Sequence, residues 1–525
     1  MAEFHLTPDQ ESAVTARDSA VLVSAAAGSG KTRVLVERLM RRVAEGEDID
    51  RFLIITYTRA AAGELRGRIQ TELGRLSAAH PEDRRLRRQA GLCCRAPIGT
   101  IHSFCTSLLR ENAQALSLVP NFRVADDNRA LAIRASVLER LMDRLYTELD
   151  VRPGLRSLID TVGAGRDDSR LTALVLELHT VLRSHPWPAR WAAEQLRAMD
   201  VRSITDAGET PWGREILDNA AENALYWAER MENALHEMSS PEHERLFTAY
   251  GPSFSDSAAG LRALARESAR GWDAACACLP IPFPNLKAFR GEDALKDEVT
   301  ALRNTVKKAA ADLLKQLEGP SERHLRELDE MRPAMSALLS LAVELDTAFS
   351  AEKRRQGLLD FSDLEHLSLR LLEDPETGAR TPLAEAVSRR YCEIMVDEYQ
   401  DVSEIQDRLF RAVSREDPEN LFFVGDVKQS IYRFRLAEPG IFLKKLHSWA
   451  DADAPKGTPR RILLRENFRS RGSVLAAANH VFSALMSPRL GELRYDEEAS
   501  LRQGAVYPPE GEVPALLSVL SLPRS

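Results

Sequence analysis

The sequence lacks the features of a secreted or membrane-spanning chain. It holds no run of about 18 apolar residues, the length needed to cross a membrane. Its N-terminus, residues 1–6, has neither the basic start nor the apolar stretch of a signal peptide. Only 6 cysteines occur in 525 residues, and they show no paired metal-ligand spacing of the CxxC…CxxC kind. A reduced cytoplasm and no membrane association are therefore predicted.

The sequence also lacks an excess of positive charge, because its formal net charge is −8. Net charge governs long-range attraction, whereas binding to nucleic acid requires only a local basic track. Taken alone, a local basic cluster is more typical of a solvated helix face than of a phosphate track. Three such clusters occur: Arg84-Arg85-Leu86-Arg87-Arg88, Lys353-Arg354-Arg355, and Lys428 with Arg433 and Arg435.

Four short apolar runs predict buried strands of a parallel sheet, because each ends at a polar or glycine-rich turn. These runs are Val21–Val23, Phe52–Ile55, Ile394–Val396 and Leu421–Val424. Helical patterns follow the first two runs, and this alternation favours an α/β fold. The length of 525 residues suffices for two or more domains with cores of their own.

The middle of the chain is predicted to be mainly helical. Leu338, Leu341, Leu345 and Phe349 keep the spacing of one buried helix face. Another α/β unit is expected to begin at Ile462-Leu463-Leu464. The predicted division is residues 1–107, the first part of an α/β domain; 108–358, a helical insertion; 359–461, the second part; and 462–525, the start of a further α/β unit.

A phosphate-binding loop is predicted directly after the first strand. It comprises Ala25, Ala26, Ala27, Gly28, Ser29, Gly30, Lys31 and Thr32, and it opens a helix. Glycines let backbone N–H groups approach phosphates, and the helix N-terminus favours negative charge. Lys31 would reach the β- and γ-phosphates, and the Thr32 hydroxyl would bind Mg²⁺. Ala25 stands where the usual pattern has its first glycine.

An acidic segment at the end of a later strand supplies the second element of an ATPase. Asp397 is predicted to hold Mg²⁺, and Glu398 to position the attacking water. The alternative is an acidic helix start, since carboxylates also stabilise a helix N-terminus.

The segment Gly425–Arg435 combines a polar sensor, Gln429, with the aromatic residues Tyr432 and Phe434. Aromatic side chains stack on bases and arginines contact phosphates, which are the needs of single-strand binding. Taken alone, Tyr432 and Phe434 would more often be core residues.

Six motifs, in order, resemble the signature motifs of UvrD/Rep-type helicases. They are Leu6–Gln10, Thr56–Ala61, Gly99–Phe104, Asp397–Asp401, Gly425–Arg435 and Asn467–Ser470. The resemblance implies a RecA-like P-loop motor domain with a large α-helical insertion, followed by the start of a second RecA-like lobe. It further implies that ATP and Mg²⁺ bind between the two lobes.

The resemblance also implies residue roles. Gln10 would hydrogen-bond adenine, Phe468 would stack on it, and Arg469 and Gln429 would meet the γ-phosphate. The implied DNA contacts are Thr58, Arg59, His102, Ser103, Tyr432 and Phe434. Phe434 stands where many relatives have tryptophan, and Phe468 where many have tyrosine, but both keep a stacking face.

Finer stretches are similar to the N-terminal portion of the AddA subunits of bacterial helicase–nucleases. These stretches are Gly357–His366, Val424–Pro439 and Tyr495–Glu498. The similarity implies 3′→5′ translocation on DNA, processing of double-strand breaks for recombinational repair, and an AddB-like partner in a bacterial cytoplasm. The later helicase motifs and the nuclease domain with its iron–sulphur cluster do not occur, so a fragment that binds nucleotide but hydrolyses it poorly is expected.

Three alternatives stay open. The chain could belong to a stand-alone UvrD- or RecB-like helicase, which a reading frame without a later nuclease would favour. It could be a non-catalytic DNA-binding or assembly module with a relict ATP site, but Lys31, Thr32, Asp397, Glu398 and Gln429 are all intact. A P-loop ATPase unrelated to nucleic acid would leave the ordered DNA-type motifs unexplained.

Overall fold

The computed structural model describes residues 6–507 except 150, 153, 163–168, 417–418 and 489. The last part of the predicted unit 462–525 therefore lies outside the described residues. The chain forms two compact units. The sheet unit comprises Met1–Leu138, Thr180–Pro188 and Leu345–Ser525, and the helical unit comprises Glu139–His179 and Ala189–Glu344.

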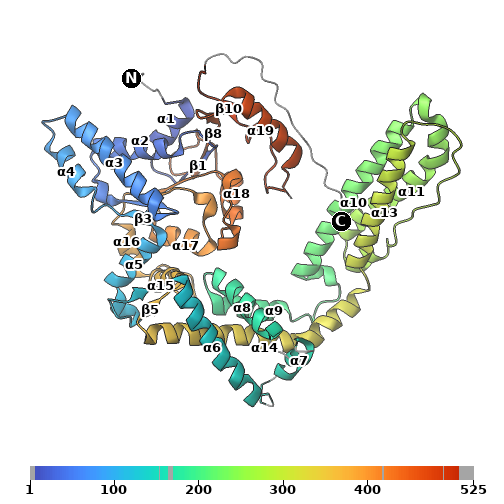
Figure 1. The fold of residues 1–525 in the computed structure, drawn as a ribbon, viewed down its shortest axis with the longest axis horizontal. Helices are drawn as coiled ribbons and strands as arrows, with labels where there is room; N and C mark the ends of the chain where they lie inside the picture. Colours follow the sequence, from blue (N-terminus) through green and yellow to red (C-terminus); the bar gives the residue numbers. More distant parts are fainter. Residues whose placement is uncertain are drawn as a thin grey trace. The chain divides into compact units, whose positions relative to one another are not determined.

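The sheet unit is built on six parallel strands in the order β3-β2-β6-β7-β1-β8 (Figure 1). The strands are β1 (Val21–Ala25), β2 (Phe52–Thr56), β3 (Ile98–Thr100), β6 (Glu393–Val396), β7 (Leu421–Gly425) and β8 (Arg460–Leu464). In the centre, Val23 pairs with Val424 and Ile54 with Met395. The predicted α/β fold with a parallel sheet is confirmed, and all four predicted strands are present.

Each face of the sheet is covered by helices around its own core. Val23 and Ile54 belong to one core, which packs under α1 (Pro8–Thr15), α2 (Lys31–Glu45), α3 (Arg59–Ala79) and α4 (Arg84–Leu92). Leu22 and Leu53 belong to the other core, because successive strand residues point to opposite faces. The helices of that second core are α5 (Ile101–Glu111), α15 (Phe361–Leu372), α16 (Pro382–Ser388), α17 (Glu404–Val413) and α18 (Pro439–Ser448).

Strand β8 differs from the sequence prediction. Its residues Ile462–Leu464 were expected to open a second α/β unit, yet β8 pairs with β1 as the sixth strand of the first sheet, with Val23 beside Ile462. An apolar run shows that a strand is buried but does not identify its neighbour, which here is far away in the sequence. Short elements follow β8: β9 (Glu466–Asn467), α19 (Gly472–Leu485) and β10 (Arg502–Gln503).

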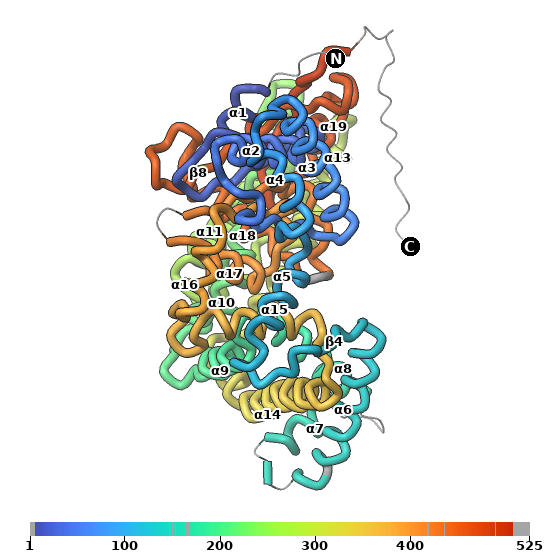
Figure 2. Tube along the Cα trace, turned by 90° about the vertical axis from the view of Figure 1, so that its left-hand side faces the viewer, coloured from blue at the N-terminus to red at the C-terminus, as the bar shows by residue number. Residues whose placement is uncertain are grey.

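The remaining elements are mainly helical. The core of the helical unit lies among α10 (Pro211–Met238), α11 (Glu244–Ser268), α12 (Trp272–Cys276) and α13 (Lys296–Gln316), and the unit also contains α7 (Leu155–Val162) and most of α9 (Pro188–Ala198). Helices α6 (Asp127–Thr147), α8 (Ser169–Ser184) and α14 (Ser321–Arg355) belong partly to each unit (Figure 2). A small parallel pair joins β4 (Arg123–Val124) to β5 (Leu358–Leu359). The predicted boundaries of the helical insertion stay a proposal.

Helix α14 confirms the predicted buried face, because Leu338, Leu341, Leu345 and Phe349 are all buried. Among the described helices, α14 is also long and apolar enough, by length and composition, to cross a membrane. However, 39% of its apolar window is buried inside the protein, and Glu344 within that helix pairs with Arg152. These properties are typical of a packed helix in a folded domain.

Candidate functional site

The loop between β1 and α2 has the backbone of a phosphate-binding loop. Gly28 and Gly30 adopt φ of 70° and 86°, a left-handed region that side chains other than glycine rarely occupy. Gly30 caps helix α2, whose first two residues are Lys31 and Thr32. The free N–H groups of this helix start therefore face the position where phosphates bind in such loops.

Gln10 lies on helix α1 and is buried against this loop. Its Nε2 donates to the Ser29 carbonyl at 2.9 Å, and its Oε1 accepts from Thr7 N at 3.1 Å. Both ends of the side-chain amide are thus engaged with the backbone. Gln10 holds the phosphate loop in place here, while its implied contact with adenine stays a prediction.

The acidic residues follow β6 at the carboxyl edge of the sheet. Asp397 N donates to the Ile55 carbonyl, and Asp397 Oδ1 accepts from Glu398 N at 3.0 Å. Glu398 has φ 54° and ψ 42°, a left-handed conformation that costs a non-glycine residue roughly 1–2 kcal/mol. Strain of this kind is characteristic of functional sites, and here it turns the Glu398 side chain away from that of Asp397.

Three predicted catalytic residues from three different loops meet in one group. Lys31 Nζ donates to Glu398 Oε2 at 2.9 Å and to Gln429 Oε1 at 3.3 Å. Gln429 lies in the turn η6 (Val427–Gln429), where its Nε2 donates to Asp426 Oδ2 at 2.7 Å. The chain therefore assembles a cation, a carboxylate and an amide at the mouth of the phosphate loop.

The electrostatics of Asp397 suit a metal ion. Burial and the neighbouring Glu398 carboxylate raise the pKa of Asp397 to about 6. A divalent cation would offset both effects. Mg²⁺ keeps most of its waters and binds through one or two carboxylates plus substrate phosphates, so Asp397 with the Thr32 hydroxyl fits this donor set. Among the described residues, no group of three or more His, Cys, Asp or Glu could hold a metal alone.

The segment after β8 packs directly on the phosphate loop. Asn467 Nδ2 donates to the Ala27 carbonyl at 2.6 Å, and Phe468 N donates to the Gly28 carbonyl at 3.0 Å. A Cβ on Gly28 would lie 2.9 Å from Arg469 Cβ, so glycine is required there for space as well as for φ. The Phe468 and Arg469 backbones thus lie beside the nucleotide loop, and their contacts with ATP stay predictions.

An aromatic surface lies next to these loops. The Tyr57 and Tyr432 rings stack with centroids 4.3 Å apart, and Tyr432 approaches Phe434 at 5.8 Å. Phe434 is 77% exposed and Ile431 is 69% exposed. A core role for Phe434 is therefore excluded. The sequence analysis had not singled out Tyr57, which completes the platform from the end of β2.

Two other predicted DNA contacts stabilise helix starts. The Thr58 hydroxyl accepts from Ala61 N at the start of α3, and the Ser103 hydroxyl donates to the Thr100 carbonyl at the start of α5. Arg59 is exposed at the first position of α3. Such hydroxyl caps serve the helix and leave any DNA contact to be tested.

His102 lies at the start of α5 in a small polar group of its own. Its Nε2 lies 3.2 Å from Glu365 Oε1, and its ring lies 4.8 Å from that of Phe361. A cavity of 620 Å³ is lined by His102 and Phe361 together with Tyr57, Asp397 and Glu398. The cavity thus connects the predicted DNA-contacting residues with the carboxylates of the nucleotide site.

The three basic clusters differ in the structure. Lys353 is buried and pairs with Asp360 at 2.5 Å and Asp363 at 2.6 Å, so it does not belong to a surface track. Lys428 pairs with Asp426 and Arg433 with Glu492, and the side chain of Arg435 lies outside the described residues.

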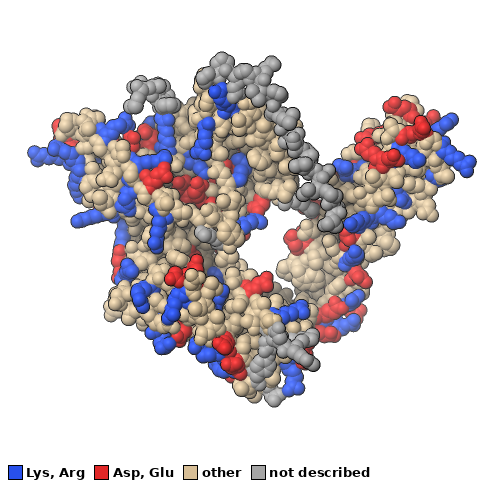
Figure 3. All heavy atoms as spheres, in the orientation of Figure 1, with Lys and Arg blue, Asp and Glu red and all other residues tan. Residues whose placement is uncertain are grey.

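Lys and Arg side chains gather over α3 and α4 (Figure 3). In this region Arg68 pairs with Glu64 at 2.5 Å, and Arg75 pairs with Glu72 at 2.8 Å. Within the Arg84–Arg88 cluster, Arg85 is half-buried and donates to the Val43 carbonyl at the end of α2. These contacts favour a solvated helix face over a phosphate track.

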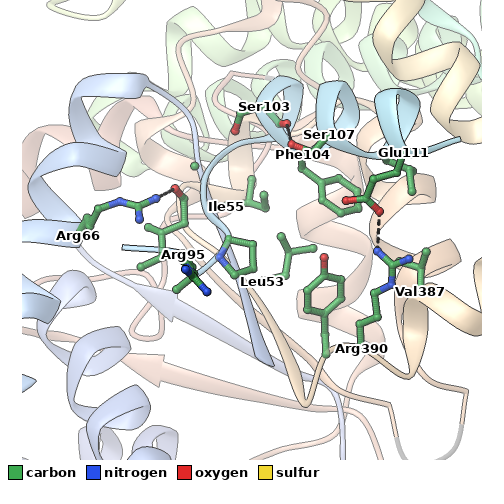
Figure 4. A pocket seen from close by; sticks show the side chains of 16 residues that line it. Leu53, Ile55, Arg66, Arg95, Ser103, Phe104, Ser107, Glu111, Val387 and Arg390 are labelled. Carbon is green, nitrogen blue, oxygen red and sulfur yellow. Dashed lines mark hydrogen bonds and ion pairs between the residues drawn. The ribbon is translucent and has the colours of Figure 1, made fainter. Parts of the chain in front are cut away.

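A second cavity, of 420 Å³, lies beside the edge strand β3 (Figure 4). Arg66 Nη2 donates to the Ile98 carbonyl at 2.6 Å, and Arg390 pairs with Glu111 at 2.8 Å across the mouth. The arginine covers a carbonyl of an edge strand, a common protection against pairing with other chains. This cavity has no lining residue from the nucleotide loops.

Comparison with known proteins agrees with this geometry. The UvrD/REP helicase N-terminal domain matches residues 6–450. An ATP-dependent helicase/nuclease subunit of Heliobacterium modesticaldum is 39% identical over 96% of this chain and 39% of its own length. The same-named protein of Pelotomaculum thermopropionicum is 38% identical over 96% of this chain and 40% of its own. The chain spans about two-fifths of the length of these curated relatives.

Proposed function

Because the chain belongs to the UvrD/REP helicase family, we propose that it is an ATP-driven motor segment that moves along DNA. The meeting of Lys31, Glu398 and Gln429 carries this proposal, because each comes from a loop that follows a different strand. A lysine for the phosphates, a carboxylate for the attacking water and an amide for the γ-phosphate are the groups that ATP hydrolysis requires.

In the proposed reaction, the phosphate loop holds the triphosphate with its backbone N–H groups, and Lys31 leaves Glu398 to bind the β- and γ-phosphates. Glu398 is then free to orient water, and Gln429 reports the presence of the γ-phosphate. Asp397 and Thr32 would hold Mg²⁺, which neutralises phosphate charge when it is bound. Arg469, whose backbone lies beside Gly28, supplies a further positive charge toward the nucleotide.

The aromatic platform is the proposed site of single-stranded DNA. Exposed aromatic rings give sequence-tolerant stacking surfaces, and Tyr57, Tyr432 and Phe434 form one beside the loop that carries Gln429. Arg59 and His102, with Thr58 and Ser103, would contact the DNA backbone. Nucleotide and DNA would therefore meet at two sides of one loop, 425–434.

The wider role rests on the relatives. The two proteins that match over 96% of this chain are both called ATP-dependent helicase/nuclease subunits. We propose that the longer relatives' role applies here: an AddA-type 3′→5′ helicase that processes double-strand DNA breaks with an AddB-like partner in the bacterial cytoplasm. An iron–sulphur cluster would belong to a nuclease region, and no residue of this chain is proposed to hold one.

The rival of another class is a non-catalytic assembly module with a relict ATP site. The hydrogen-bonded group of Lys31, Glu398 and Gln429 counts against it, since a relict site has no reason to keep all three in contact. A stand-alone helicase differs from the AddA-type role only in what accompanies the motor, so the residues of the site favour neither.

The test is equilibrium binding by the chain itself. We expect Mg²⁺ with a non-hydrolysable ATP analogue to bind, and a short oligo-dT strand to bind independently. Absence of nucleotide binding in well-folded protein would overturn the proposal. Steady-state ATP hydrolysis with and without oligo-dT then separates a motor segment from an assembly module, which would show no DNA-dependent change.

A further inference from the structure

Gln400 lies between the nucleotide site and the proposed DNA site and contacts both. Its Nε2 donates to Glu398 Oε2 at 2.8 Å, and its Oε1 accepts from the backbone N–H of Asp426 at 2.9 Å. Gln400 is 1% exposed. One buried side chain thus joins the carboxylate proposed to orient water to the first turn of the loop 425–434.

The orientation of this amide is fixed by its partners. The backbone N–H of Asp426 can only donate, so the oxygen of Gln400 must face it and the NH₂ group must face the Glu398 carboxylate. The Gln400 carbonyl also accepts from Ser430 Oγ at 3.4 Å, further along the same loop. The side chain and the backbone of Gln400 therefore both follow the position of loop 425–434.

Gly425 provides a second, independent observation. A Cβ at this position would clash with Gln400 Oε1 and would lie 3.0 Å from Phe442 Cε2. Gly425 does not need a left-handed backbone, because it is absent from the residues with positive φ. The glycine is required for space: it lets the Gln400 amide pass over the end of β7 to reach Asp426.

The two ends of the bridge belong to movable groups. Glu398 is held in a strained left-handed conformation, and its carboxylate is shared between Lys31 and Gln400. At the other end, Asp426 holds both Gln429 at 2.7 Å and Lys428 at 2.9 Å, and the loop continues to Tyr432 and Phe434. A shift of this loop on binding DNA changes the Asp426–Gln400 contact and, through it, the Glu398 carboxylate.

We propose that Gln400 is a positioning residue that couples DNA on the loop 425–434 to the Glu398 carboxylate, with Gly425 leaving the space for this bridge. The inference rests on the proposed function, because it assigns the path by which the two ligands affect each other. It predicts coupling between the two sites that depends on Gln400 even when no ATP is hydrolysed.

The experiment measures this coupling as a ratio of affinities. The dissociation constant of an Mg²⁺-bound, fluorescent, non-hydrolysable ATP analogue is determined without DNA and with saturating oligo-dT. For the unaltered chain we expect the two constants to differ by roughly 5–150-fold, the usual range of coupling between sites. The reciprocal titration, oligo-dT with and without nucleotide, must give the same factor.

Two variants break opposite ends of the bridge. Gln400→Glu keeps an oxygen for the Asp426 N–H but removes the donor to Glu398. Gly425→Ala leaves Gln400 intact and fills the space of its Oε1. Each is expected to reduce the coupling factor to below about 2-fold, a near loss of the coupling range above, while changing each separate affinity by less than about 3-fold. The double variant should lose no more than either single variant, because both break one path.

Matched controls make the same chemical changes elsewhere. Gln70→Glu alters an exposed residue of α3, and Gly74→Ala adds a methyl group where nothing lies within 4 Å. Both should keep the full coupling factor.

A full coupling factor in folded Gln400→Glu and Gly425→Ala proteins would overturn the inference. The same holds if the unaltered chain binds both ligands without coupling, although the proposed function would then stand. Failure of the unaltered chain to bind nucleotide would overturn the function and the inference together.

Discussion

Helix α2 and strand β6 are joined twice, by two ion pairs of opposite character. Near the middle of the helix, Arg38 pairs with Glu393 at 2.6 Å, and the side chains are 1% and 4% exposed. At the start of the helix, Lys31 pairs with Glu398 at 2.9 Å, and the side chains are 13% and 37% exposed. The same two elements thus carry one dry contact and one that solvent and ligands can reach.

The surroundings of each pair explain the difference. Arg38 binds both oxygens of Glu393, donates to the Ala13 carbonyl, and lies over the Phe422 ring, while Arg42 adds a third bond. Every polar group there is satisfied within the fold. Lys31 instead has a flexible stem and a point charge that can move from Glu398 to a phosphate. The buried pair fixes the helix against the strand, and the open pair can exchange partners.

The largest expected effect is on stability, for Glu393→Gln. Removing this charge leaves Arg38 buried without a counter-ion, which typically costs about 3–5 kcal/mol. Urea unfolding followed by circular dichroism measures the loss. A double variant, Arg38→Met with Glu393→Leu, should recover much of it, because an apolar pair leaves no buried charge. A loss below about 1 kcal/mol, the range of exposed pairs, would show that the contact is not fixed as inferred.

The pH dependence of the same variant provides a further check. Burial favours the neutral form of Glu393, but Arg38 and Arg42 outweigh it and hold the pKa below its ordinary value of 4.5. A lowered pKa in the folded state stabilises the fold above that ordinary value, and the stabilisation is lost as pH falls through the folded pKa. The stability difference between Glu393→Gln and the unaltered chain should therefore shrink in acid.

The next effect concerns nucleotide binding, for Lys31→Ala. A lost charged hydrogen bond to phosphate costs roughly 1.5–3 kcal/mol, which weakens binding of the ATP analogue by roughly 10–100-fold. Unfolding stability should change by less than about 1 kcal/mol, because the Lys31 pair is partly exposed. Fluorescence titration measures the affinity. Lys307→Ala, at an exposed position of α13, is the matched control and should bind normally.

A similar test separates the aromatic platform from the core. Phe434→Ala should weaken binding of oligo-dT by roughly 1–3 kcal/mol, the scale of one lost base stack. Stability should not change, because the ring is 77% exposed. Phe247→Ala removes a ring that is 39% exposed in the helical unit and should leave DNA affinity unchanged. Equal affinity of both variants would remove Phe434 from the proposed DNA site.

Much of the fold could be predicted from the sequence, since strands buried on both faces are written as short apolar runs. Val21–Val23 and Leu421–Val424 lie in strands as expected. The order of the strands could not be predicted. Strand β8 joins β1 across more than 400 residues, and β3 has only three residues including Gly99. Neither pairing leaves a local signal, because both depend on the packing of the whole sheet.

For the site, the division follows the chemistry. The phosphate loop and Asp397 were found because glycines and strand-end carboxylates are rare combinations with a known use. Gln400 was missed because its role depends on the backbone N–H of Asp426, which no composition reveals. Lys353 was placed in a basic cluster because its neighbours are arginines. Its partners Asp360 and Asp363 lie beyond the end of α14, and they bury its charge.

The smallest expected effect tests the comparison most directly. Glu398→Gln is the same chemical change as Glu393→Gln, made just beyond the other end of β6. It should alter unfolding stability by less than about 1 kcal/mol, because the pair is partly exposed and an amide oxygen still accepts from Lys31. Urea unfolding of the two variants side by side measures the contrast. Equal losses would mean that both pairs are fixed parts of the fold, and Lys31 would then have no freedom to leave Glu398 for a phosphate.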